Sequence, residues 1–290
     1  MIQPILLTDL DNTLYNWKDY FAKSFRGMVH ALSEKTKVEE DIIINEFRTV
    51  YSAHKSLEYS FALQEFEIFR SLPKKELQEL INLAITVFNQ VGMRNLKPYD
   101  GVKETLSWAK NVGITVVGVT NAPLAHAHKR IKRLGLSKYF SGLAGRKDPS
   151  IPQDMQITRK IKKGVDDGNY SSKIKKFWEL EPNQLKPNSF VFREIMDHYH
   201  IGSNLLFVVG DSLHSDIKPA LDIGAVGIWA RYGKDCDESS NETLSKITPW
   251  DANMIADIEF SAPVVPTFTI DQFIEIERII PPPQETLPGF

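Results

Sequence analysis

Two carboxylates separated by one residue follow a short apolar run near the start of the chain. The run is residues 5–7 (ILL), and Asp9 and Asp11 come just after it. Carboxylates this close repel one another when both are charged, and apolar surroundings raise that cost. A bound divalent cation resolves the conflict, and oxygen ligands of this kind suit Mg²⁺, which often takes phosphate oxygens as further ligands. The pair therefore indicates a magnesium and phosphate site; the alternative is a pair of ordinary turn carboxylates after a strand.

Polar groups suited to phosphate chemistry also follow two later apolar runs. Residues 113–121 (GITVVGVTN) and 205–211 (LLFVVGD) each predict a buried strand, because aliphatic and β-branched residues dominate them. Parallel strands of open α/β sheets present ligand-binding groups at their carboxyl ends, so these groups should share one edge. The groups are Asp9, Asp11, Thr120, Asn121, Gly210, Asp211 and, after a turn, Asp216. Lys186, at the start of an expected helix, could add a positive charge there.

The elements that must position these groups alternate between apolar strands and amphipathic helices. This alternation predicts an α/β fold, with a parallel, Rossmann-like sheet and helices on both of its faces. The further strands expected are 114–119, 142–145, 205–209, 225–230 and 268–270. The helices expected between them are about 102–111, 124–134, one that opens at 186–188, 216–223 and 271–280.

Residues 17–96 interrupt the alternation, since they contain no convincing strand. Their apolar residues recur at helical spacing, which predicts a small all-helical cap domain. The expected helices start near 17, cover 39–54 and 57–72, and follow Pro73. Phe61, Phe66 and Phe69 should pack in the interior of this unit, as aromatic residues at helical spacing usually do.

The expected α/β core is therefore discontinuous, formed by residues 1–16 and 97–290 around the cap. Within it, residues 146–184 are polar and form an expected insertion, with a short helix near Trp178. Phe177 and Trp178 should pin this insertion against the core or the cap. A C-terminal extension follows residue 233 and looks mostly irregular. The basic run at Lys129, Arg130, Lys132 and Arg133 is interpreted as a solvated helix face.

Composition excludes several classes of function. The net charge of −2 gives no basic field for nucleic acid, and no apolar run reaches the length of a membrane span. Cys236 is the only cysteine, so an intrachain disulfide and a thiolate metal cage are both impossible. The first residues lack the pattern of a secretory signal, which makes a cytoplasmic location the expectation. The sequence does not indicate an oligomeric state.

Four short motifs, in chain order, resemble those of the haloacid dehalogenase-like hydrolases. They are DLDNTL at 9–14, VTN at 119–121, LKP at 185–187 and GDSLHSD at 210–216. The helical segment after the first motif is similar to the family's first type of cap. The resemblance covers residues 1–16 and 97 to about 230, and it implies Mg²⁺ as the cofactor.

The resemblance also implies a role for each motif residue. Asp9 would be the nucleophile that forms an aspartyl phosphate, and Asp11 the general acid and base. Thr120, the backbone N–H of Asn121 and Lys186 would hold the phosphoryl group. The remaining roles are Asp211 as a metal ligand together with Asp9 and the backbone carbonyl of Asp11, Asp216 as a further ligand or supporting acid, Gly210 for close backbone approach and Thr13 for orienting the loop.

The expected function is that of a phosphatase that hydrolyses a small phosphorylated metabolite, such as a nucleotide or a sugar phosphate. A phosphomutase would use the same residues and pass the phosphoryl group to a sugar in place of water. A non-catalytic binding protein on a hydrolase fold is disfavoured, because no expected catalytic position is substituted. Substrate choice should lie in the cap and the insertion, whose sequences do not identify it.

Overall fold

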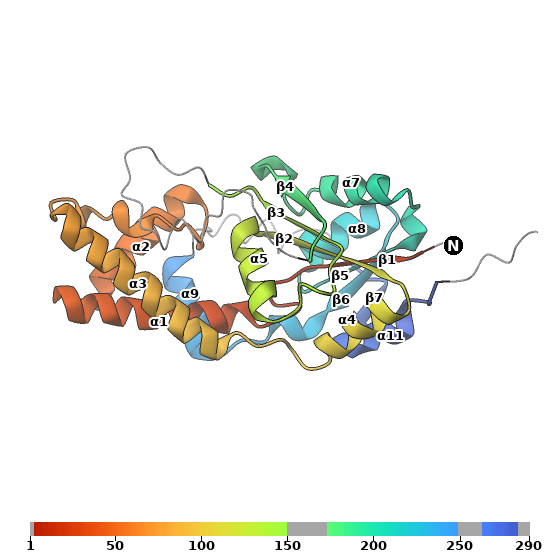
Figure 1. Ribbon diagram of the computed structural model, residues 1–290, viewed down its shortest axis with the longest axis horizontal. Helices are drawn as coiled ribbons and strands as arrows, with labels where there is room; N and C mark the ends of the chain where they lie inside the picture. The colour runs from red at the N-terminus through yellow and green to blue at the C-terminus, as the bar shows by residue number, and fades with distance from the viewer. Residues whose placement is uncertain (1–2, 150–172, 249–262, 284–290) are drawn as a thin grey trace, which may run out of the picture.

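A parallel sheet forms the centre of the structure, a computed structural model that describes residues 3–149, 173–248 and 263–283. Within these ranges seven parallel strands form one sheet in the order β4-β3-β2-β1-β5-β6-β7 (Figure 1). The strands are β1 (Ile5–Thr8), β2 (Thr115–Pro123), β3 (Gly142–Arg146), β4 (Lys176–Leu180), β5 (Leu206–Gly210), β6 (Val226–Ala230) and β7 (Phe268–Ile270). The predicted α/β class is confirmed.

The central strand β1 is buried on both faces. Ile5 and Leu7 belong to one hydrophobic cluster and Leu6 to the other, as alternation along a strand requires. In register, Thr8 lies beside Gly118 of β2 and Val209 of β5. β1 and β5 therefore end within one residue of the same level, whereas β2 continues for five residues past Gly118. The residues that follow β1 and β5 and those in the last part of β2 lie at one edge.

Helices cover both faces of the sheet. One cluster holds residues of α4 (Val102–Asn111), α5 (Leu124–Arg133) and α11 (Ile276–Ile279), and the other holds residues of α7 (Phe190–Tyr199) and α8 (Lys218–Asp222). Figure 1 shows α7 and α8 on one side of the strands and α4 and α11 on the other. None of the helices in the described ranges is long and apolar enough to cross a bilayer.

Three long helices lie beside the sheet as a separate group, at the left of Figure 1. They are α1 (Trp17–Thr36), α2 (Glu40–His54) and α3 (Lys74–Asn95). Ring contacts join them: Phe25 packs edge-on against Phe47 at a centroid distance of 5.0 Å, and Tyr20 packs against Phe88 at 6.1 Å. Buried aromatic rings supply much of the packing in this group.

The expected helix over 57–72 is wrong. Only two short 3₁₀ turns form there, η1 (Ala62–Gln64) and η2 (Glu67–Phe69). Phe61 and Phe66 are both buried, as expected, but they are five positions apart, which would place them on different sides of an α-helix. The chain buries both rings by turning twice.

The expected short helix near Trp178 is also wrong, because these residues form the edge strand β4. Phe177 packs against one hydrophobic cluster and Trp178 against the other. Adjacent side chains that point to opposite faces of the sheet are typical of a strand and not of a helix. The two rings do hold this part of the expected insertion to the core; residues 150–172 lie outside the described ranges.

The C-terminal extension forms a helix that contacts the helical group. After β6 come η6 (Arg231–Lys234) and α9 (Glu238–Ile247), which packs against α1 and α2. Arg26 of α1 donates hydrogen bonds to the backbone oxygen of Ser239 and to the Thr243 hydroxyl, both at 2.8 Å. From the sequence, residues 233–262 are expected to be irregular with one possible helical stretch, and α9 lies within this range.

Candidate active site

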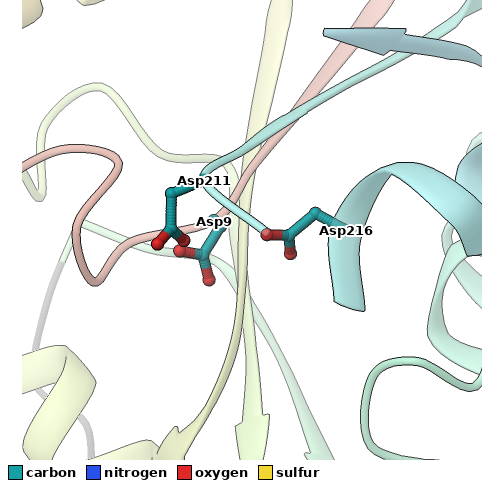
Figure 2. Close-up of side chains that lie close together, drawn as sticks. All are labelled: Asp9, Asp211 and Asp216. Carbon is teal, nitrogen blue, oxygen red and sulfur yellow. The ribbon is translucent and has the colours of Figure 1, made fainter. Parts of the chain in front are cut away.

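Three carboxylates meet at the carboxyl edge of β1 and β5. Asp9, Asp211 and Asp216 each offer an oxygen within 4.8 Å of the others (Figure 2). Asp9 follows β1, Asp211 follows β5, and Asp216 lies in the π-helical turn Leu213–Ile217. Gly210 permits this approach, since a Cβ there would lie 2.3 Å from the Asp216 carboxylate carbon.

One lysine lies among these acids. The Nζ of Lys186 is 2.6 Å from Oδ1 of Asp9 and 2.5 Å from Oδ1 of Asp216, and the residue is only 7% exposed. The side chain of Asn121 makes two hydrogen bonds to the backbone of Lys186. Its amide nitrogen donates to the Lys186 carbonyl at 2.8 Å, and its amide oxygen accepts from the Lys186 N–H at 2.9 Å. The predicted role of Asn121 concerned its backbone N–H, and this side-chain contribution was missed.

The cluster carries more negative charge than its lysine offsets. Burial, together with the charges of Asp216 and Asp11, raises the pKa of Asp9 to about 7 against the opposing effect of Lys186. Burial and the charge of Asp9 raise the pKa of Asp211 well above its ordinary range. Burial alone would lower the pKa of Lys186, but the two carboxylates raise it. A divalent cation that prefers oxygen ligands fits this donor set and would relieve the excess charge.

The side chain of Asp11 points away from this cluster. Its Oδ1 accepts a hydrogen bond from the Tyr15 hydroxyl at 2.7 Å. Its Oδ2 accepts from Arg130 Nη2 at 3.2 Å and from the Thr120 hydroxyl at 3.3 Å. Burial raises the pKa of Asp11, and the charge of Arg130 opposes the rise. Of the predicted ligands, Asp11 could reach the cluster only through its backbone carbonyl.

Thr13 completes the loop around the first carboxylate. Its hydroxyl donates to Oδ2 of Asp9 at 3.2 Å, while Lys186 holds Oδ1. Both oxygens of Asp9 therefore have partners that fix the orientation of its carboxylate. The orienting role of Thr13 stays a prediction, and this contact is consistent with it.

Arg130 is the site residue that the sequence reasoning missed. The interpretation of the basic run as a solvated face is wrong for Arg130, which is 3% exposed. Its guanidinium bonds to Asp11, to Glu58 and to the Tyr15 hydroxyl. The available signal was its helical position, three residues after Ala127 and four before Leu134, both of which are buried.

Glu58 brings the helical segment to this edge of the sheet. It lies between α2 and η1, pairs with Arg130 and accepts a hydrogen bond from the Trp17 indole N–H at 3.1 Å. Burial alone would raise the pKa of Glu58, but the charges of Arg130 and His126 outweigh it and hold the pKa below its usual range. A charged Glu58 therefore ties residues of the helical segment to the helix that follows β2.

Comparisons with known proteins agree with the geometry. The model of a family described as haloacid dehalogenase-like hydrolase matches residues 4–224. The chain is 26% identical over 144 residues to a phosphoglycolate phosphatase of Agrobacterium fabrum, a match that covers 49% of this chain and 58% of the relative. It is 23% identical over 240 residues to a glyceraldehyde 3-phosphate phosphatase of Methanopyrus kandleri, covering 81% and 86% of the two chains.

A solved structure shows the same fold. It is a HAD phosphatase from Thermococcus onnurineus, with a TM-score of 0.55 and 16% sequence identity, over 97% of this chain and 99% of that one. At this identity the likeness concerns the fold alone. The first curated relatives are matched over only 58% of their length, so the whole-chain activities of those relatives do not transfer directly.

Proposed function

This chain belongs to the haloacid dehalogenase-like hydrolases, and on that premise we propose that it is a Mg²⁺-dependent phosphatase that acts on a small phosphate monoester. The observation that carries the proposal is the position of Asp9, whose carboxylate is held by Lys186 and Thr13 beside two further acids. The phosphatase names of the curated relatives support it. The expected partner is a phosphorylated metabolite.

The proposed Mg²⁺ ligands are Asp9, Asp211 and the backbone carbonyl of Asp11. Asp216 is better suited to support Lys186, because its Oδ1 contacts that lysine and its Oδ2 accepts from the Ser212 N–H at 3.1 Å. When bound, Mg²⁺ would neutralise charge on the carboxylates and on the phosphoryl oxygens.

In the first step an oxygen of Asp9 attacks phosphorus, and the bond from phosphorus to the leaving oxygen breaks. Asp11 gives its proton to that oxygen, so the alcohol leaves neutral; the raised pKa of Asp11 favours the protonated form that this role needs. Lys186, the Thr120 hydroxyl and the Asn121 backbone N–H would hold the phosphoryl oxygens while charge develops on them.

In the second step water attacks the phosphorus of the aspartyl phosphate. Asp11, now deprotonated, takes a proton from that water, and Asp9 is released as a carboxylate with inorganic phosphate. Arg130 donates to Asp11 and is not needed to hold the phosphoryl group, so it can keep the Asp11 carboxylate near one position through both proton transfers.

We further propose that residues 17–96 act as the cap over a core of residues 1–16 and 97–290. Glu58 reaches Arg130 at the catalytic edge, which is where a lid must lie. The proposed hinges are residues 15–18 and 96–100. Since α9 packs on α1 and α2, an opening of this cap would have to carry α9 or break its contacts.

A panel of phosphate monoesters assayed for released phosphate, with Mg²⁺ and with EDTA, tests the function. We expect hydrolysis of some members with Mg²⁺ and none with EDTA. The Asp9→Asn variant should be inactive on all of them while its circular dichroism spectrum matches wild type. Hydrolysis that continues in EDTA, or in the Asp9→Asn variant, would refute the proposal.

A further inference from the structure

A cavity lies between the helices of the proposed cap and α5, and Arg130 forms part of its wall. Its volume is about 170 Å³, and α1, α2, α3 and α5 all contribute to its lining. Most of the lining is aromatic or aliphatic, and includes Phe21, Phe47, Tyr51, Phe61, Ile81 and Phe88. Apolar walls of this kind favour an apolar occupant over one that must keep its hydration shell.

The cavity shares part of its wall with the proposed chemical site. Arg130 and Glu58 both line it, and Arg130 also donates to Asp11, the proposed acid for the leaving oxygen. A leaving group whose oxygen lies at Asp11 would therefore contact Arg130, and the cavity lies beside the same side chain. Among the described residues, Arg130 is the only one that both lines the cavity and donates a hydrogen bond to Asp11.

One polar side chain in the lining is unpaired. Gln64, in η1, lines the cavity, and both its amide nitrogen and its amide oxygen are buried without a hydrogen-bond partner in the described part of the chain. Buried amides are almost always paired, so an unpaired one calls for an occupant. The Gln64 amide nitrogen is a donor and its oxygen an acceptor, so together they could pair with a second amide, which offers an acceptor and a donor side by side.

From the cavity and the unpaired Gln64 amide, we propose that the substrate's leaving group carries one apolar ring with an amide-like edge, which the cavity receives. The proposal deepens the phosphatase function proposed above and rests on it. A cavity of about 150 Å³ lined by apolar side chains can bind benzene in another protein, so a volume of about 170 Å³ suits a single ring. A polyhydroxylated sugar would leave hydroxyls unpaired against the aromatic walls.

Binding of phosphonates, which cannot be hydrolysed, tests the proposal independently of turnover. The probes are ethylphosphonate, 2-phenylethylphosphonate and the para-carboxamide of the latter, titrated calorimetrically in Mg²⁺. We expect the ring to tighten binding by roughly tenfold over ethylphosphonate, and the carboxamide by roughly tenfold more. Equal affinity for the three probes would overturn the proposal.

Two variants locate the binding. Gln64→Leu should remove the advantage of the carboxamide and keep that of the ring. Ala84→Leu, which fills the cavity from α3, should remove the advantage of the ring and leave ethylphosphonate binding unchanged. Ring-dependent binding that survives Ala84→Leu, in a variant with the wild-type unfolding temperature, places the ring elsewhere and overturns the proposal.

Hydrolysis of the matching phosphate esters separates this inference from the proposed function. If the ring-bearing phosphonates bind as expected but neither benzyl phosphate nor its carboxamide is turned over, the phosphatase function fails and the cavity's preference stands. If glucose 6-phosphate is hydrolysed and the ring-bearing probes bind no better than ethylphosphonate, the function stands and the cavity's preference fails.

Discussion

The Nζ of Lys186 lies 2.6 Å from Oδ1 of Asp9, although the two residues are 177 positions apart in the chain. Both side chains are buried, and the lysine also contacts Asp216. Removing one partner of a buried charge pair leaves the other without compensation. Loss of this pair should therefore lower both the catalytic rate and the free energy of unfolding.

Lys186→Met should lower kcat by about 100-fold or more, because a buried positive charge near the transferred phosphoryl group is lost. The unfolding free energy should also fall by about 3 kcal/mol, since Asp9 and Asp216 lose their shared partner. Steady-state kinetics and urea unfolding measure the two effects. Wild-type kcat in this variant would contradict the role of Lys186.

Asn121→Ala should lower kcat by about tenfold, because it removes both hydrogen bonds that fix the Lys186 backbone. Asn95→Ala is the matched control: its amide also bonds to a backbone carbonyl, that of Val91, but in α3 and away from the site. Asn121→Ala should lose somewhat more stability than Asn95→Ala, because it removes two hydrogen bonds and the control removes one. If kcat drops equally in the two, Asn121 has no specific positioning role.

Arg130→Met should lower kcat and raise KM for the substrate, because it frees Asp11 and breaks the pair with Glu58. Lys132→Met is the control on the same helix, at an exposed position, and should behave as wild type. In a double-mutant cycle with Glu58→Gln, the coupling in the free energy of unfolding should exceed about 1 kcal/mol. Additive effects would show that Glu58 and Arg130 act independently.

The stability of the metal-free protein should depend on pH through Asp9. Its pKa rises from 3.8 to about 7 on folding, so the folded chain holds a proton that the unfolded chain releases. The contribution of this proton to the free energy of unfolding is fully present below about pH 3.8, and it is lost as the pH rises through about 7.

In EDTA, Asp9→Asn should therefore gain stability relative to wild type between pH 4 and pH 7, by an amount on the order of 1 kcal/mol or more. Saturating Mg²⁺ should shrink this gain, because a cation stabilises the charged carboxylate of wild type. Urea unfolding at several pH values measures the difference. A difference that is constant with pH would show that Asp9 titrates normally.

Much of the sheet and its site residues could be predicted from the sequence because their signals are local. A run of consecutive apolar residues predicts a buried strand, and Asp9 and Asp211 come at or near the ends of such runs. The two incorrect elements lie where the period is ambiguous: Phe61 and Phe66 are buried by turns, and Trp178 lies on an edge strand that follows a long polar stretch.

The role of Arg130 could not be predicted, because it depends on partners from distant segments. Glu58 comes from the helical segment and Asp11 from the loop after the first strand, and the residues near position 130 indicate neither contact. The run of basic residues around Arg130 is typical of a solvated face. Its helical position relative to Ala127 and Leu134 indicates burial, but it does not indicate which groups the guanidinium contacts.

The most direct test of the account is to identify the residue that carries phosphate during turnover. The enzyme, mixed with Mg²⁺ and a hydrolysed monoester, is quenched in acid within one turnover, and its peptides are analysed by mass spectrometry. We predict phosphate on the peptide that contains Asp9, and its absence in Asp9→Asn. Rapid turnover without phosphate on any peptide, or with phosphate on a residue other than Asp9, would contradict the account.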